Sequence, residues 1–171
     1  MLFHKKNNNV DLYNILLTLS RNKFFYEKIH LSDTFETRVY LMFVHFSIIL
    51  KIFKKKKIKF EQSQYDFLFH TIENNLRELG FGDISVNKKM KDLNKVFYDI
   101  LLKFEKKTSS NVFEIDKTFL KKYFFELNNI DAIEFNDFRQ YFLDFYNYCF
   151  EIPLESVLKD IKNFKFNYGS S

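Results

Sequence analysis

The chain has 171 residues, of which 46% are hydrophobic and 20% aromatic, and its net charge is +5. The aromatic content excludes an intrinsically disordered chain, and the single cysteine excludes an internal disulfide framework and fits a reducing compartment. Three glycines and one proline are too few for the tight turns of an all-β sandwich or barrel. A chain of this length buries roughly 70% of its unfolded surface, so we expect one compact domain over residues 1–171.

The charge is unevenly distributed along the chain. Residues 1–110 carry 20 Lys and Arg against 12 Asp and Glu, whereas residues 111–151 carry 4 against 8. Residues 1–110 are therefore basic overall and residues 111–151 acidic, so the two signs of charge are expected on different sides of the molecule.

The basic total alone is weak evidence for an anionic partner. AT-rich codons also favour Lys, Asn, Ile and Phe, so the bias in composition can come from the genome.

Neither a targeting segment nor a membrane span is expected. No apolar region follows Lys5 and Lys6, and no arginine precedes Arg21, so the N-terminus is typical of neither a secretory signal nor a mitochondrial presequence. Val39 to Phe53 is the most apolar stretch, and the lysines after it imitate the positive flank of a span. The stretch is shorter than the roughly 20 residues that a span needs and contains His45. It is expected to be a buried helix of a soluble protein.

Helical periodicity predicts the first half of an all-α fold. Two short helices are expected over Val10–Ser20 and Phe24–Ile29. Asp33 is then expected to accept from the first turn of a long helix in a capping box with Glu36. Apolar residues lie on two faces of this long helix, so it should be central.

The second half continues the helical pattern, to a total of about seven or eight helices. A helix opened by Ser63 ends at Gly80, which is placed to be its C′ glycine, and Ser85 is expected to cap the next helix. Thr108 to Ser110 should break that helix. The remaining helices are predicted near Val112–Leu127, Ala132–Phe150 and, after Pro153, Leu154–Phe164.

Residue patterns for catalysis, metal binding or cofactor binding are missing. The four histidines and Cys149 have no metal-ligand spacing, and Cys149 lies on an apolar stripe typical of a core. Gly80-Phe81-Gly82-Asp83 lacks the third glycine of a phosphate-binding loop and favours a structural turn. His45 favours a buried, hydrogen-bonded histidine over a haem ligand or a pH switch. We therefore expect no enzyme, no metal and no cofactor.

Two groups of lysines are candidates for an anionic partner. The first is a basic segment, which consists of Lys54, Lys55, Lys56, Lys57 and Lys59. The second group, Lys88, Lys91 and Lys95, is spaced to share one face of a helix. Each group is either ordinary solvated surface or a binding site for rRNA, anionic lipid or an acidic protein segment, and the pattern does not distinguish these.

Two blocks of the sequence form a pattern of a known family. The first block runs from Phe25-Tyr26 through Asp33-Thr34-Phe35-Glu36-Thr37-Arg38 to Phe43-Val44-His45-Phe46. The second is Leu76-Arg77-Glu78-Leu79-Gly80-Phe81-Gly82-Asp83, followed by Val86, Lys88, Lys91 and Phe97-Tyr98. In order and spacing, over residues 24–104, they resemble the ubiquinol–cytochrome c chaperone family, with its "LRE-x-G-x-GD-x-x-V-x-K-x-x-K" signature in alphaproteobacterial members.

The resemblance implies an all-helical assembly factor for the cytochrome bc1 complex (ubiquinol–cytochrome c reductase, respiratory complex III). Such a factor binds newly made, unassembled cytochrome b and has no catalytic residue and no cofactor. Its further partners would be a small co-chaperone, the ribosome or an anionic membrane surface, and not DNA. The expected location is cytoplasmic and peripheral at the inner membrane of a bacterium, or the matrix side of a mitochondrion.

The resemblance and the charge pattern together give candidate site residues. We predict that the client-binding surface contains Arg38, His45, Arg77, Asp83, Lys88 and Lys91. The basic segment is predicted to face the membrane or the ribosome. For several of these residues a structural role is the alternative, because Arg77 and Asp83 are placed to fix the glycine turn and His45 to fill the core. The alternative function is a ribosome- or RNA-associated helical protein that uses the basic segment.

Overall fold

The computed structural model describes residues 9–105, 113–153 and 155–168, and all regular elements in these ranges are helical. The all-α prediction is thereby confirmed. The elements are α1 (Asn9–Ser20), the π-helical turn η1 (Phe24–Lys28), α2 (Phe35–Lys55), α3 (Gln62–Glu78), α4 (Asp83–Glu105), α5 (Lys117–Tyr123), the 3-10 turn η2 (Phe125–Asn128), α6 (Ala132–Glu151), α7 (Val157–Asp160) and the 3-10 turn η3 (Ile161–Asn163).

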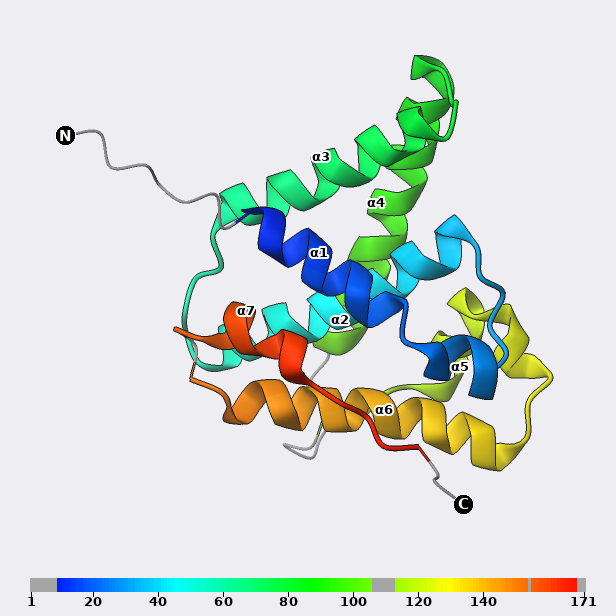
Figure 1. Cartoon of the computed structure of the whole chain (residues 1–171), viewed down its shortest axis with the longest axis vertical. Coiled ribbons are helices and arrows are strands. Elements are labelled where there is room, and N and C mark those ends of the chain that lie inside the picture. Colours follow the sequence, from blue (N-terminus) through cyan, green and yellow to red (C-terminus); the bar gives the residue numbers. More distant parts are fainter. Residues whose placement is uncertain (1–8, 106–112, 154, 169–171) are drawn as a thin grey trace.

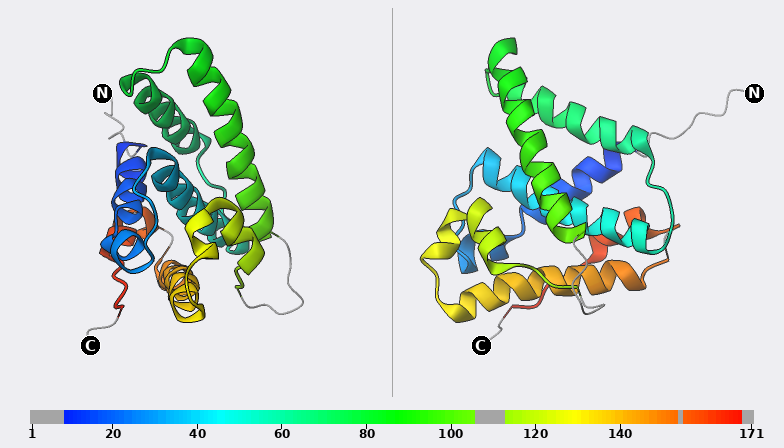
Figure 2. Two further views of the ribbon diagram at one scale, coloured as in Figure 1. Left: turned by 90° about the vertical axis from the view of Figure 1, so that its right-hand side faces the viewer. Right: turned by 180° about the vertical axis from the view of Figure 1, so that it is seen from behind.

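Helix α2 is the centre of the fold. Every residue from 41 to 49 is buried, and the helix packs against α1, α4 and α6. Figures 1 and 2 show α1 and α4 crossing α2 on its opposite sides, with α6 running along a third. The prediction of a buried central helix is confirmed. Among the helices of the described ranges, none combines the length and the apolar character that crossing a membrane requires.

The core is built mainly from aromatic rings. Phe25 and Tyr141 meet edge to face with ring centroids 4.6 Å apart, and Phe24 stacks on Tyr141 at 5.5 Å. On the other side of α2, Phe97 of α4 packs against Phe43 and the surrounding rings. Offset and edge-to-face contacts of this kind add to the stabilisation from burial itself. The buried side chains form one continuous cluster that connects α1, α2, α4 and α6.

The structure corrects the predicted helix starts in the first half of the chain. Thr34, not Asp33, caps α2, because its Oγ1 accepts from the backbone N–H of Thr37 at 3.1 Å. Helix α3 begins at Gln62 and its preceding residue makes no side-chain cap, so Ser63 is not a cap. Helix α4 begins at Asp83, which places Ser85 inside its first turn. Each of these three helices therefore begins one or two residues away from the cap that the sequence predicts.

The predicted bounds also change in the second half. Within the range predicted as one helix, α5 begins only at Lys117, where the carboxylate of Asp116 accepts from the N–H of Thr118 at 2.7 Å. The last predicted helix is shorter, since α7 begins at Val157 and continues into η3. The predicted break at residues 108–110 lies outside the described residues. The prediction for α6 is confirmed to within one residue.

Gly80 ends α3 as the sequence predicts. Its φ of +96° lies in the region that favours glycine, and its N–H donates to the carbonyl of Arg77 at 2.9 Å. The N–H of Phe81 donates to the carbonyl of Leu76 at 3.3 Å. These two bonds define a Schellman motif, in which Phe81 and Leu76 occupy the positions that commonly make a hydrophobic contact. The turn between α3 and α4 is therefore fixed by backbone geometry.

The two glycines of this turn should respond differently to alanine. Gly80→Ala is expected to lower the free energy of unfolding by about 1–2 kcal/mol, because its φ is costly for any residue with a Cβ. Gly82 has no such φ, and open space surrounds both positions. Gly82→Ala should therefore cost only about 0.5 kcal/mol, because alanine is less favourable than glycine at the residue that precedes a helix. Urea denaturation of both variants measures the difference. Equal losses would contradict the assignment of strain to Gly80.

Candidate functional site

The turn between α3 and α4 forms an exposed tip at one end of the molecule (Figure 1). We call residues 77–84 the α3–α4 tip. Its apolar residues Leu79, Phe81 and Ile84 are exposed, Ile84 to 89%. Arg77 and Asp83 meet across the turn at 3.5 Å. A tip with apolar side chains in solvent and a charged pair beside them has the composition of a protein-binding surface.

A cleft lies beside the tip, between α2, the end of α3, and α4. We call it the α2–α4 cleft; its volume is about 210 Å³, and it is lined by Phe35, Glu36, Tyr40, Leu76, Lys89, Asp92 and Leu93. Burial, reinforced by the carboxylates of Glu36 and Asp92, raises the pKa of Tyr40. The Nζ atom of Lys89 lies 4.6 Å from the ring centroid of Phe81, which joins the cleft to the tip. An apolar floor with a charged rim suits an amphipathic peptide segment.

The tip and the cleft contain two of the six predicted client residues, Arg77 and Asp83. Arg77 is also held by Glu73, whose Oε1 accepts from Nη2 at 2.9 Å. Lys88 and Lys91 are exposed on α4, but neither lines the cleft. The structure thus brings together the residues of the glycine turn and leaves the two lysines on another face of the same helix.

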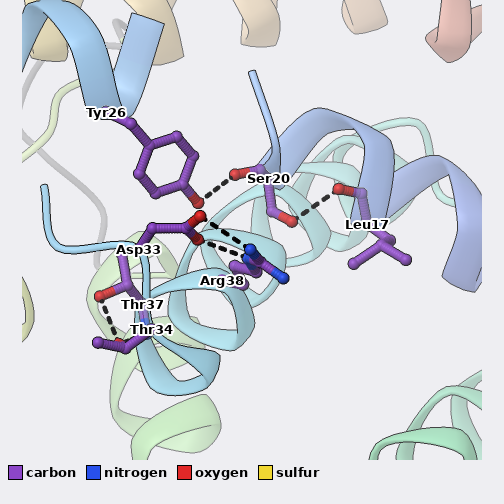
Figure 3. Close-up of polar contacts among 7 residues, drawn as sticks. All are labelled: Leu17, Ser20, Tyr26, Asp33, Thr34, Thr37 and Arg38. Carbon is purple, nitrogen blue, oxygen red and sulfur yellow. Dashed lines mark hydrogen bonds and ion pairs between the residues drawn. The ribbon is translucent and has the colours of Figure 1, made fainter. Parts of the chain in front are cut away.

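Arg38 is held within a local network at the start of α2 (Figure 3). Its Nε and Nη2 atoms donate to the two carboxylate oxygens of Asp33 at 2.7 and 2.9 Å. This bond to the guanidinium is the main reason that the pKa of Asp33 is lowered. The neighbouring Tyr26 hydroxyl donates to the carbonyl of Ser20 at 2.6 Å. Because both carboxylate oxygens of Asp33 accept from Arg38, Asp33 does not cap α2.

His45 is fully buried and therefore cannot touch a client in this structure. Its Nδ1–H donates to the carbonyl of Leu41 at 2.6 Å, since a carbonyl only accepts. Nε2 therefore accepts from the hydroxyl of Tyr141 on α6, at 2.9 Å. The inclusion of His45 in the client surface is thus corrected, and the alternative of a satisfied core histidine is confirmed.

The basic segment does not form one free surface. The Nζ atom of Lys56 donates to the carbonyls of Phe150 and Ile152, at 2.6 and 3.2 Å, and so binds the C-terminal end of α6. Lys55 lies over the ring of Phe150, at 5.2 Å from its centroid. Lys54, Lys57 and Lys59 are exposed. Contact with a membrane or ribosome stays a prediction for this segment, in which Lys55 and Lys56 already contact the end of α6.

Neither a metal-ligand group nor a reactive thiol is found among the described residues. No group of three His, Cys, Asp or Glu side chains in these ranges is placed to hold a metal ion. Cys149 is buried on α6, and burial raises the pKa of its thiol well above the usual value. A thiol that stays protonated in the core is not a nucleophile, so Cys149 has the packing role that its apolar stripe predicts.

Comparison with known proteins agrees with the two sequence blocks. Residues 27–162 match the family described as Ubiquinol-cytochrome C chaperone. The chain belongs to this family. No curated protein and no solved structure gives a significant match. The family match extends beyond the predicted region, residues 24–104, through α5 and α6 to η3.

Most residues of the chaperone's tip and cleft were not predicted as site residues. Helical spacing would place Leu79 on the inward face of α3, but the residue lies past the last helical residue and is exposed. The cleft residues Glu36 and Asp92 come from segments far apart in the sequence, and no local spacing connects them. The sequence does indicate the exposure of Ile84, because this residue is apolar yet out of phase with the buried stripe of its helix.

The burial of His45 should make the free energy of unfolding depend on pH. Burial lowers the pKa of His45 to about 4. Between about pH 6.5 and pH 4, the unfolded chain binds a proton there that the folded chain does not. The free energy of unfolding should therefore fall with decreasing pH, by up to about 1.4 kcal/mol per pH unit from this group. Urea denaturation near pH 7 and near pH 5 should show that His45→Gln removes this contribution.

The exposed His70 provides the matched control, since His70→Gln should keep the wild-type pH dependence. If His45→Gln does not fold, NMR titration of the His45 ring in the wild-type protein measures the pKa directly. The prediction would be refuted if the free energy of unfolding fell equally between pH 7 and pH 5 for the wild type and for His45→Gln. It would also be refuted if the His45 ring titrated near pH 6.5.

Lys56 and Lys59 should differ in their effect on stability. Lys56→Ala removes a charged donor from two carbonyls at the C-terminal end of α6 and is expected to cost about 1–2 kcal/mol. Lys59→Ala removes the same charge from an exposed position and should change stability by less than about 0.5 kcal/mol. Thermal or urea unfolding compares the two. Similar small effects would show that the α6 contact contributes nothing.

Proposed function

We propose that this protein binds newly made cytochrome b and holds it for assembly into the cytochrome bc1 complex. The family match over residues 27–162 carries the proposal, because it indicates a role in assembly of that complex. We further propose that the client contacts the α3–α4 tip and the α2–α4 cleft. The client is a membrane protein, so the chaperone would work peripherally, at the cytoplasmic or matrix face of the membrane.

The exposed apolar residues at the tip support this choice of surface. An unassembled membrane protein presents apolar segments that lack their partners, and Leu79 and Phe81 offer matching apolar contact. The rigid Schellman turn holds these side chains in place before binding, which lowers the ordering cost of association. Glu36 and Asp92 at the rim of the cleft are placed for cationic groups of the client.

A double substitution at the tip tests the proposal. Leu79→Ser with Phe81→Ser should lower crosslinked capture of cytochrome b from detergent-solubilised cells by at least about tenfold, because two apolar contacts are lost. The matched control is Phe125→Ser with Ile133→Ser, which removes two apolar residues from η2 and α6 that are even more exposed than Leu79 and Phe81. Mass spectrometry after capture measures the enrichment of cytochrome b.

The outcomes separate the parts of the proposal. Enrichment of cytochrome b without other subunits of the complex would support an early assembly role. Ribosomal proteins alone, without cytochrome b, would overturn it in favour of a ribosome-associated protein. Capture that is unchanged by the tip variant, or equally reduced by the control, would leave the client role but reject the tip as its surface.

A further inference from the structure

The outward face of α4 lies outside the α2–α4 cleft and shares only Ile84 with the α3–α4 tip. We call it the outer α4 face; it consists of Ile84, Lys88, Lys91, Lys95, Tyr98 and Leu102. Steps of three and four residues place all six on one stripe of the helix, opposite the buried Val86, Leu93 and Phe97. All six are exposed, Tyr98 to 52% and Leu102 to 58%.

The outer α4 face carries positive charge without carboxylates among its six positions. Of the neighbouring acidic residues, Asp83 and Asp99 have partners outside this face. Asp83 pairs with Arg77 at 3.5 Å, and Asp99 accepts from Nζ of Lys122 at 2.7 Å. Asp92 lines the α2–α4 cleft. The three lysines therefore form a basic group in the middle of the stripe, with Ile84 at one end and Tyr98 and Leu102 at the other.

The shape of this face is a straight, convex ridge. Figure 2 shows α4 at the outer edge of the molecule in one view and in front of α2 in the other. From Ile84 to Leu102 the helix rises by about 27 Å. A ridge of this length meets a planar surface along its whole stripe, whereas a globular partner would need a matching groove.

We propose that the outer α4 face binds an anionic membrane surface. The lysines would lie against lipid phosphates, and Ile84, Tyr98 and Leu102 would enter the headgroup region, as in peripheral amphipathic helices. RNA fits less well, because aliphatic side chains gain nothing from a phosphate backbone. The proposal goes beyond the client role and assigns Lys88 and Lys91 to lipid instead.

Vesicle flotation of the purified full-length protein tests this assignment. We expect binding to phosphatidylcholine vesicles that contain about 30% phosphatidylglycerol, and at least about tenfold weaker binding to phosphatidylcholine alone. Lys88→Ser, Lys91→Ser and Lys95→Ser together should weaken binding to the anionic vesicles at least about tenfold. The matched control replaces Lys159, Lys162 and Lys165, three exposed lysines near the C-terminus, and should bind as the wild type does.

The absence of tryptophan from the chain allows a second, independent measurement. Leu102→Trp introduces a single tryptophan at one end of the outer α4 face, and its emission should shift to shorter wavelength when anionic vesicles are added. Phe125→Trp, at a residue 73% exposed outside this face, should show no shift. A shift at position 102 alone places that end of α4 in the lipid.

Several results would overturn the proposal. In the flotation experiment, these are a wild type that does not bind anionic vesicles, or an equal loss of binding in both lysine variants. In the fluorescence experiment, they are an emission wavelength that does not shift for Leu102→Trp, or one that shifts for Phe125→Trp as well. Binding to poly(U) RNA that the Lys88, Lys91 and Lys95 substitutions abolish, without vesicle binding, would assign the face to RNA. No cytochrome b is present in these experiments, so their failure leaves the proposed client role untouched.

Discussion

The structure depends on one constraint, the nearly complete burial of α2. Nine consecutive buried residues, 41 to 49, require neighbours on all sides of the helix, and α1, α4 and α6 provide them. His45 brings a polar group into this apolar environment, where Leu41 and Tyr141 satisfy both ring nitrogens. The side-chain hydrogen bond to Tyr141 helps to fix α6 against α2 in a specific register, which apolar contact alone specifies less strictly.

This arrangement determines where partners can bind. Because residues 41 to 49 of α2 are buried, that part of the helix is not available to a client, and exposed apolar residues occur on the elements around it. The α3–α4 hairpin extends from the body and carries Leu79, Phe81 and Ile84 at its tip (Figure 1). The same hairpin offers two chemically different surfaces, a mixed-charge cleft facing α2 and a basic, convex face turned away from it.

Periodicity predicted the central helix and α6 well, because a buried helix must repeat its apolar residues every three to four positions. The glycines also predicted the turn at Gly80, and the family resemblance marked Arg77 and Asp83 beside it as candidate site residues. The cap of α2 was not predictable in the same way, since Asp33 and Thr34 are both good caps and only the bidentate bond of Arg38 decides between them. The cleft depends on the tertiary packing of three helices. The role of Lys56 depends on the end of α6, which lies 94 residues away in the sequence. Sequence spacing reveals neither of these contacts.

The long separation between α2 and α6 has a consequence for biosynthesis. The hydrogen bond between His45 and Tyr141 joins residues 96 positions apart. At a synthesis rate of about 5–20 residues per second, roughly 5–20 s pass before α6 leaves the ribosome and can cover its side of α2. During that interval the most apolar segment of the protein is incompletely covered. A protein that belongs to a chaperone family thus passes through a stage in which it exposes the kind of surface that chaperones protect.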